Sequence, residues 1–130
     1  MKKMFFLLAF TAGLVACKKG AGDGGTSTLR GKVYGIDYNA DFSMRLDSGY
    51  APNENVYVIY GDHKTYDDKI STNYDGTYEF KYLRQGTYTV YCYSKDSATS
   101  IPFGTQAIIQ TAEITKNRST VEIPTININK

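Results

Sequence analysis

The chain has 130 residues, of which 15 are basic and 13 acidic. This balance provides no clustered cationic field, so it excludes a nucleic-acid-binding protein of the usual basic kind. The two cysteines are Cys17 and Cys92, and if the first is modified no intrachain disulfide can form, which leaves stability to the hydrophobic core.

Residues 1–16 have the layout of a secretory signal peptide. Two lysines precede an apolar run at residues 4–10, which is too short to span a bilayer as a permanent helix. The segment ends in the letters LVAC, which resemble the lipobox of bacterial lipoproteins. The resemblance implies that Cys17 becomes the first residue after cleavage and carries acyl chains such as palmitate. Because two acyl chains hold a protein at a membrane, we expect lipid anchoring in the cell envelope, at the outer membrane, facing the periplasm or the cell surface.

The segment after this cysteine reads KKGAGDGGTST and contains no large apolar residue. Segments rich in Gly, Ser and Thr behave as flexible chains, so the sequence predicts a flexible tether over residues 17–28. Cleavage before Cys17 would also remove two lysines and leave the mature chain near neutrality. The remaining residues, 29–130, are enough for one domain that buries its own core.

The domain shows several short runs that alternate apolar and polar residues, and no sustained helical period, which predicts an all-β structure. The expected strands are residues 29–36, 55–60, 69–73, 77–83, 87–93, 105–114 and 119–128. Seven short strands in about one hundred residues favour a seven-stranded antiparallel β-sandwich. Asp75-Gly76 and Gly86 fit tight hairpin turns, and Pro124 inside the last strand indicates an edge or a bulge.

Alternation also assigns side chains to the two faces of each strand. One face is expected to form the core, with these side chains pointing inward: Val56, Val58, Tyr78, Phe80, Tyr88, Val90 and Cys92. Tyrosines of opposite parity, Tyr82, Tyr91 and Tyr93, are expected on outer faces, where a flat ring fits a pleated surface without a ligand. Cys92 is expected to act as a small hydrophobe and not as a reactive thiol.

Three stretches carry a family resemblance: GKVYG, then APNENVYVIY, then STNYDGTYEFKYLRQGTYTVYCY. Together they resemble the carboxypeptidase regulatory-like domain, a member of the transthyretin-like (prealbumin-like) β-sandwich group. The resemblance covers residues 29–93 and continues more loosely to residue 128, with an insertion at residues 37–51. It departs from the family at Asn73, where the family usually has Asp. Such domains are mostly passive modules, so the resemblance implies a fold and a non-catalytic role.

The chain lacks the residues that catalysis in this group requires. The transthyretin-like enzymes that hydrolyse 5-hydroxyisourate use several histidines, an arginine and a C-terminal Tyr-Arg-Gly-Ser, whereas this chain has one histidine, His63, and ends in ININK. An isolated imidazole has no orienting or nucleophilic partner, so no catalytic residue and no cofactor is expected. The aspartates between residues 62 and 75 match no EF-hand spacing and suit backbone-bonded turns, so no metal site is expected, with calcium binding left open.

Two functions remain open. One is a structural or protein-binding module on the envelope membrane, and the other is a carbohydrate or small-ligand binder that uses exposed aromatic rings. If successive antiparallel strands alternate in direction, the loops 37–54, 73–76 and 94–104 lie far from the tether. Long loops on a rigid sandwich often carry binding residues, although some of these rings would equally fold the loops onto the sandwich. The sequence therefore predicts a binding apex formed by Tyr38, Phe42, Tyr50, Tyr74 and Phe103.

Overall fold

The computed structural model describes residues 20–96 and 104–130, and every regular element within them is a β-strand. The predicted signal peptide, Cys17 and Phe103 lie outside the described residues. The strands are β1 (Asp23–Tyr38), β2 (Arg45–Tyr50), β3 (Asn55–Tyr60), β4 (Asp68–Ser71), β5 (Thr77–Leu83), β6 (Gly86–Lys95), β7 (Thr105–Ile114), β8 (Thr120–Glu122) and β9 (Ile126–Asn129). A search of this part of the chain for a helix long and apolar enough to cross a membrane finds none.

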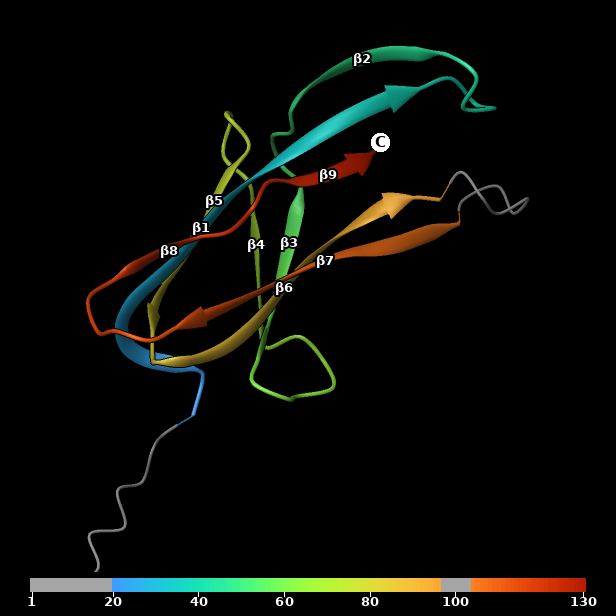
Figure 1. The fold of residues 1–130 in the computed structure, drawn as a ribbon. Coiled ribbons are helices and arrows are strands. Elements are labelled where there is room, and N and C mark those ends of the chain that lie inside the picture. The colour runs from blue at the N-terminus through green and yellow to red at the C-terminus, as the bar shows by residue number, and fades with distance from the viewer. Residues whose placement is uncertain (1–19, 97–103) are drawn as a thin grey trace, which may run out of the picture.

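The long strand β1 pairs with each of the other strands of the first sheet, β2, β5, β8 and β9 (Figure 1). Its first half pairs with antiparallel β5 on one edge and parallel β8 on the other, so that Leu29 lies opposite both Phe80 and Val121. Its second half pairs with antiparallel β2 and parallel β9, so that Tyr34 lies opposite both Tyr50 and Asn127. Both edges of β1 are therefore hydrogen-bonded along most of the strand.

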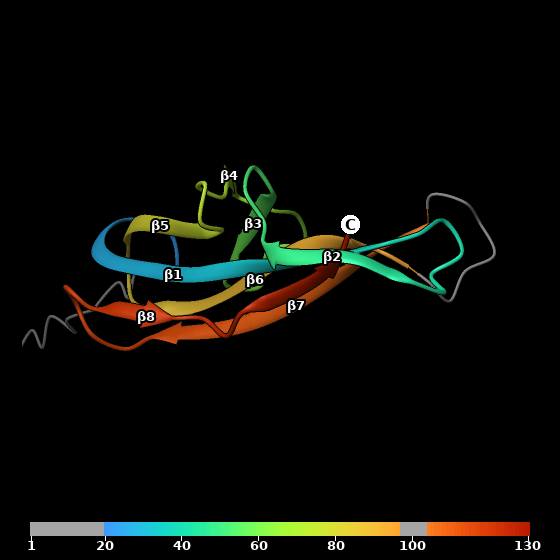
Figure 2. The ribbon, with the colours of Figure 1, turned by 90° about the horizontal axis from the view of Figure 1, so that it is seen from above.

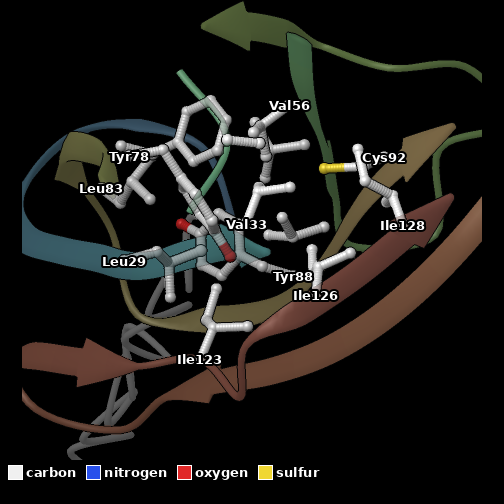
Figure 3. Close-up of a cluster of buried hydrophobic side chains, with 14 of the residues drawn as sticks. Leu29, Val33, Val56, Tyr78, Leu83, Tyr88, Cys92, Ile123, Ile126 and Ile128 are labelled. Carbon is white, nitrogen blue, oxygen red and sulfur yellow. The ribbon is translucent and has the colours of Figure 1, made fainter. Parts of the chain in front are cut away.

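The second sheet has the order β4-β3-β6-β7, is antiparallel throughout, and lies against the first sheet (Figure 2). The core fills the space between the sheets and contains the side chains that alternation assigned to it. Val56, Val58, Tyr78, Tyr88 and Val90 are at most 1% exposed. Figure 3 shows Leu29, Val33 and Ile126 of the first sheet close to Val56, Tyr88 and Cys92 of the second. The period-two prediction of the core is confirmed.

The all-β, two-sheet prediction is confirmed, but the seven-stranded antiparallel arrangement differs from the nine strands observed. The segment Arg45–Tyr50 was expected to be loop and forms β2, because edge pairing with β1 stabilises a strand whose side chains are mostly exposed. The predicted strand 119–128 is two strands, β8 and β9, because Pro124 between them has no N–H for the ladder. Both run parallel to β1, not antiparallel.

A flexible tether was predicted over residues 17–28, and in its described part, residues 20–28, the structure shows an ordered segment instead. Strand β1 begins at Asp23, and Arg84, just after β5, holds the residues before and around that start. Its Nε donates to the carbonyl oxygen of Gly20 at 2.8 Å, and its Nη1 donates to that of Asp23 at 2.7 Å. The Arg84 backbone N donates to the carbonyl oxygen of Gly22 at 2.8 Å. We refer to these three hydrogen bonds as the Arg84 clamp.

A second residue, Tyr88, fastens the same segment from inside the sandwich. Its buried hydroxyl accepts from the Gly22 N–H at 2.9 Å and lies 2.6 Å from the carbonyl oxygen of Arg84. Backbones also approach closely here, since a Cβ on Gly25 would lie 2.1 Å from the carbonyl oxygen of Leu83. Glycine is required at such an approach because no other residue leaves room for it. Composition alone suggested mobility, but tertiary contacts hold this glycine-rich segment in place.

Candidate functional site

The five aromatic residues of the predicted binding apex do not form one cluster. Tyr38 and Phe42 meet at the tip of the β1–β2 hairpin, with ring centroids 5.5 Å apart. The tip is closed by Asn39, whose carbonyl oxygen accepts from Phe42 N at 3.0 Å and whose side chain accepts from Met44 N at 3.0 Å. Both aromatic rings are half-buried, so at this tip they serve partly to pack the hairpin.

Tyr50 lies at the opposite end of β2 from this tip, close to the turn that follows Tyr74. The Tyr50 ring makes an edge contact with Tyr34 at 5.5 Å, and Lys32 Nζ lies 4.6 Å from its centroid. The turn that carries Tyr74 is beside it, since a Cβ on Gly76 would lie 2.9 Å from the Tyr50 Cβ. Tyr74 is 91% exposed. Of the predicted apex, only Tyr38 and Phe42 are in ring contact within the described residues, and the fifth member, Phe103, lies outside them.

A larger aromatic group lies on the outer surface of the second sheet. We call it the tyrosine face, and it consists of Tyr57 on β3, Tyr91 and Tyr93 on β6, Tyr66 on the loop after β3, and Ile109 on β7. These positions are neighbours across the sheet, because Tyr57 lies opposite Tyr91, and Tyr91 opposite Ile109. Tyr66, Tyr93 and Ile109 are 49%, 50% and 57% exposed. Exposed apolar groups gathered in this way are typical of interaction surfaces.

The rings of the tyrosine face cover one another. Tyr57 and Tyr91 are stacked, with centroids 5.0 Å apart and planes inclined by only 11°. Tyr66 and Tyr93 make edge contacts with Tyr57 at 5.0 and 5.5 Å, and Tyr93 also meets Tyr91 at 5.6 Å. Burial, followed by the neighbouring Tyr93, raises the pKa of Tyr91, so its hydroxyl stays protonated at neutral pH. The surface is thus a set of packed ring edges and hydroxyl groups.

Sequence reasoning placed Tyr91 and Tyr93 on an outer face correctly, but it did not bring them together with the other members. Parity shows only that two residues of one strand share a face. The register between β3 and β6 is needed to add Tyr57, and the course of the loop after β3 is needed to add Tyr66. The sequence did contain a signal for Tyr57, because alternation within NVYVIY places this residue on the outer face of its strand.

The aspartates between residues 62 and 75 bond to nearby backbone groups. Asp67 accepts from Tyr60 N at 2.7 Å, and its other carboxylate oxygen lies 2.8 Å from His63 Nδ1. Asp75 accepts from Thr77 N at 3.1 Å and so closes the turn at Gly76, which has a φ of 79°. Within residues 20–96 and 104–130, no three His, Cys, Asp or Glu side chains lie together as a metal-holding group. His63 and the aspartates therefore shape loops in this structure.

A hollow of about 800 Å³ lies at the end of the sandwich where β1 begins. It is lined by the start of β1, the segment after β5, the end of β7 and the β7–β8 turn, including Gly20, Gly24, Arg84, Glu113 and Asn117. We call this end of the sandwich, formed by residues 20–26, 84–86 and 115–119, the near end. The Arg84 side chain there is already bonded to two backbone carbonyl oxygens, so it acts as a structural group.

Comparison with known proteins leaves the family of this chain open. No protein family and no curated protein matches the chain. Among solved structures, a crystal structure from Pseudomonas aeruginosa, described as that of a candidate carbohydrate binding protein, is similar over 85% of this chain and 92% of that chain. Sequence identity is 12% and the TM-score is 0.48. A likeness of this size carries no argument about function, which has to be made from the surface itself.

Proposed function

We propose that the chain is a lipid-anchored lipoprotein of the cell envelope whose domain is a non-catalytic module that binds another protein. The anchor is supported by the LVAC letters that end at Cys17. A carboxypeptidase regulatory-like relationship is supported by the GKVYG, APNENVYVIY and STNYDGTYEF motifs, and an all-β, two-sheet structure is compatible with it. The outer membrane, facing the periplasm or the cell surface, is the proposed location.

The observation that carries the binding role is the tyrosine face. Tyrosine is enriched among the residues that dominate binding energy at protein interfaces, because it combines a large apolar body with a hydroxyl. A rigid cluster also loses little side-chain freedom on binding, which favours affinity. Tyr66, Tyr93 and Ile109 supply exposed apolar area, while Lys69 and Lys95 lie at neighbouring positions of β4 and β6 as a polar rim.

The ring geometry favours a protein over a sugar as the partner. A sugar ring stacks on an open aromatic face, but the Tyr57 and Tyr91 faces are turned toward each other at 5.0 Å. Tyr66 and Tyr93 also make edge contacts with Tyr57. Ring edges and hydroxyls suit a mixed apolar and hydrogen-bonding protein surface. Carbohydrate binding is the alternative that the experiment below separates.

The test compares the full-length wild type with a Tyr66→Ser/Tyr93→Ser variant in affinity capture from cross-linked cell envelopes. We expect the wild type to retain a specific protein that the double variant loses, provided that the variant still unfolds cooperatively. A Tyr38→Ser/Tyr50→Ser/Tyr74→Ser variant, which changes the predicted apex and not the tyrosine face, serves as the matched control and is expected to retain the partner.

The other outcomes would point to a different binding surface or a different class of ligand. If only the apex variant loses the partner, the binding surface is the one predicted from the loops, and the tyrosine face is structural. If the wild type captures no specific protein but binds sugars on a glycan array, and the double variant does not, the module is a carbohydrate binder. Equal capture by all three proteins would remove both aromatic surfaces from consideration.

A further inference from the structure

The Arg84 clamp leaves very little chain between the proposed lipid and the folded domain. Three residue steps separate Cys17 from Gly20, the first residue that the clamp holds. A fully extended chain covers at most about 3.6 Å per residue, so this connection spans at most about 11 Å. The headgroup layer on each side of a bilayer is roughly 5–8 Å thick. With a lipid on Cys17, the near end consequently lies at the headgroups or within a few ångströms of them.

At this distance from the membrane, either of two corners of the domain could face the headgroups. One is the β7–β8 turn at residues 115–119, which exposes Lys116 and Arg118 and contains no acidic residue. The other is the loop and strand start at residues 61–68, which begins beside the near end because Gly61 N donates to the carbonyl oxygen of Thr87 at 2.9 Å. That segment carries three aspartates, Asp62, Asp67 and Asp68, and a single lysine, Lys64. Figure 1 shows the turn and the acidic loop at separate corners.

The cationic turn is joined to the same strand start that the clamp holds. Arg118 N donates to Thr26 Oγ1 at 3.0 Å, and Ser27 Oγ donates to the carbonyl oxygen of Lys116 at 2.8 Å. Thr28 N also donates to the carbonyl oxygen of Ser119 at 2.9 Å. The turn, the clamp and residues 20–28 are therefore parts of one hydrogen-bonded unit. If the turn binds a membrane surface, the entire domain is therefore oriented with it.

We infer that the near end binds an anionic lipid surface through Lys116 and Arg118, and that this contact selects one tilt of the anchored domain. The inference rests on the proposed lipid anchor at Cys17. Each lysine or arginine near an anionic membrane raises the ratio of bound to unbound orientations by about fivefold. The same negative surface repels each aspartate of the acidic loop. The turn therefore faces the headgroups while the acidic loop is turned away from them. The side of the second sheet that carries the tyrosine face stays accessible.

The experiment measures how close three points of the full-length lipoprotein lie to the headgroups. Spin labels are attached at Asn117→Cys on the cationic turn, Thr65→Cys on the acidic loop and Ala40→Cys on the β1–β2 hairpin, all at exposed positions. The native Cys92 is 1% exposed and is not labelled. Vesicles contain a nickel-chelating lipid in phosphatidylcholine, with or without phosphatidylglycerol, and relaxation of each label by headgroup nickel is recorded.

In anionic vesicles we expect the label at position 117 to be relaxed most, that at 65 clearly less and that at 40 least. Without phosphatidylglycerol the difference between 117 and 65 should shrink. A Lys116→Gln/Arg118→Gln background should shrink it in anionic vesicles as well, by about fivefold in the population ratio for each cation removed. Equal relaxation at 117 and 65 in anionic vesicles, or strongest relaxation at 40, overturns the inference.

Failure of the anchor is recognised separately, by flotation. Wild-type lipoprotein should float with both kinds of vesicle, and Cys17→Ala should remain unbound in phosphatidylcholine. If Cys17→Ala floats as well as the wild type there, the lipid anchor is wrong and the inference falls with it. If Cys17→Ala fails to float as expected but the spin labels do not show the expected order of relaxation, the lipid anchor is supported and only the proposed tilt is wrong.

Discussion

Phe80 and Thr89 illustrate how strongly the two faces of a strand differ. Phe80 is 3% exposed and makes an edge contact with Tyr78 at a centroid distance of 6.0 Å. Thr89 lies on the outer face of β6, opposite Ile59 on β3 and Thr111 on β7. We expect Phe80→Ala to lower the free energy of unfolding by about 3–5 kcal/mol, because it leaves a cavity in the core. Thr89→Ala should cost far less, and equal losses in urea titrations would contradict the assigned register.

The buried Cys92 and the partly buried Tyr60 predict a loss of stability at alkaline pH. Burial raises the pKa of the Cys92 thiol from 9.0 to about 12, and burial, followed by Asp68, raises that of Tyr60 from 10.0 to about 12. Both groups are neutral when protonated, and the unfolded chain loses these protons at lower pH than the folded one. Their contribution to stability is thus complete below about pH 9 and is lost as the pH rises toward 12.

The variant Cys92→Ala distinguishes the contribution of the Cys92 thiol to the pH dependence of stability from that of Tyr60. The variant is less stable at every pH because a buried side chain is shortened, so the relevant measurement is the slope of the urea midpoint against pH. Between pH 8 and about 10 the wild type should lose stability and the variant should lose less, since the thiol is the first group to titrate. Identical slopes in this range would show that Cys92 is not the group responsible.

The strands that could be predicted from the sequence are those whose side chains alternate between core and surface. The bounds of β3, β5 and β7 agree with the expected 55–60, 77–83 and 105–114. In β3 burial alternates with partial exposure, and most of β7 alternates between exposed and partly buried residues. Strand β2 has no such alternation, and only its pairing with β1 makes it a strand. The first six residues of β1 were expected to be flexible because neither composition nor period reveals hydrogen bonds made to the distant Arg84.

The same reasoning applies to the candidate surface. Tyr91 and Tyr93 could be placed on an outer face by alternation, but the tyrosine face depends on the pairing of β3 with β6 and of β6 with β7 and on the loop that carries Tyr66. The apex prediction assumed that loops on one end of the sandwich converge. It did not foresee that β2 would separate Tyr38 and Phe42 from Tyr50 and Tyr74. Long-range pairing is the information that a local pattern lacks.

The clamp itself makes a prediction about the start of β1. Arg84→Ala removes two hydrogen bonds to the carbonyl oxygens of Gly20 and Asp23, so residues 20–23 should open more often. We expect amide hydrogen exchange in this segment to accelerate at least about tenfold, while exchange in β6 changes little. Lys81→Ala, which removes an exposed cation of β5, is the control and should leave the segment protected. Unchanged exchange in Arg84→Ala would mean that Tyr88 and the backbone hydrogen bond from residue 84 to Gly22 suffice to hold the segment.

At the level of the entire protein, the proposed anchor predicts where the chain resides in the cell. Metabolic labelling with a fatty-acid analogue should mark the wild type, and the protein should appear in the membrane fraction. Cys17→Ala should be unlabelled and absent from that fraction, because its thiol is the proposed attachment point. Label that persists on the variant would contradict the assignment of Cys17.

The position of β1 at the centre of the first sheet has a consequence for the order of folding. Its second half is completed by β9, so Val33 pairs with Ile126, which lies 93 residues further along the chain. Pairings between such distant residues close large loops and slow folding, here to roughly the millisecond-to-second range. Until the C-terminal strand arrives, one edge of β1 is unpaired and open to association with other chains. A chain shortened by its last five residues should therefore aggregate during refolding, whereas the complete chain protects its first strand with its last.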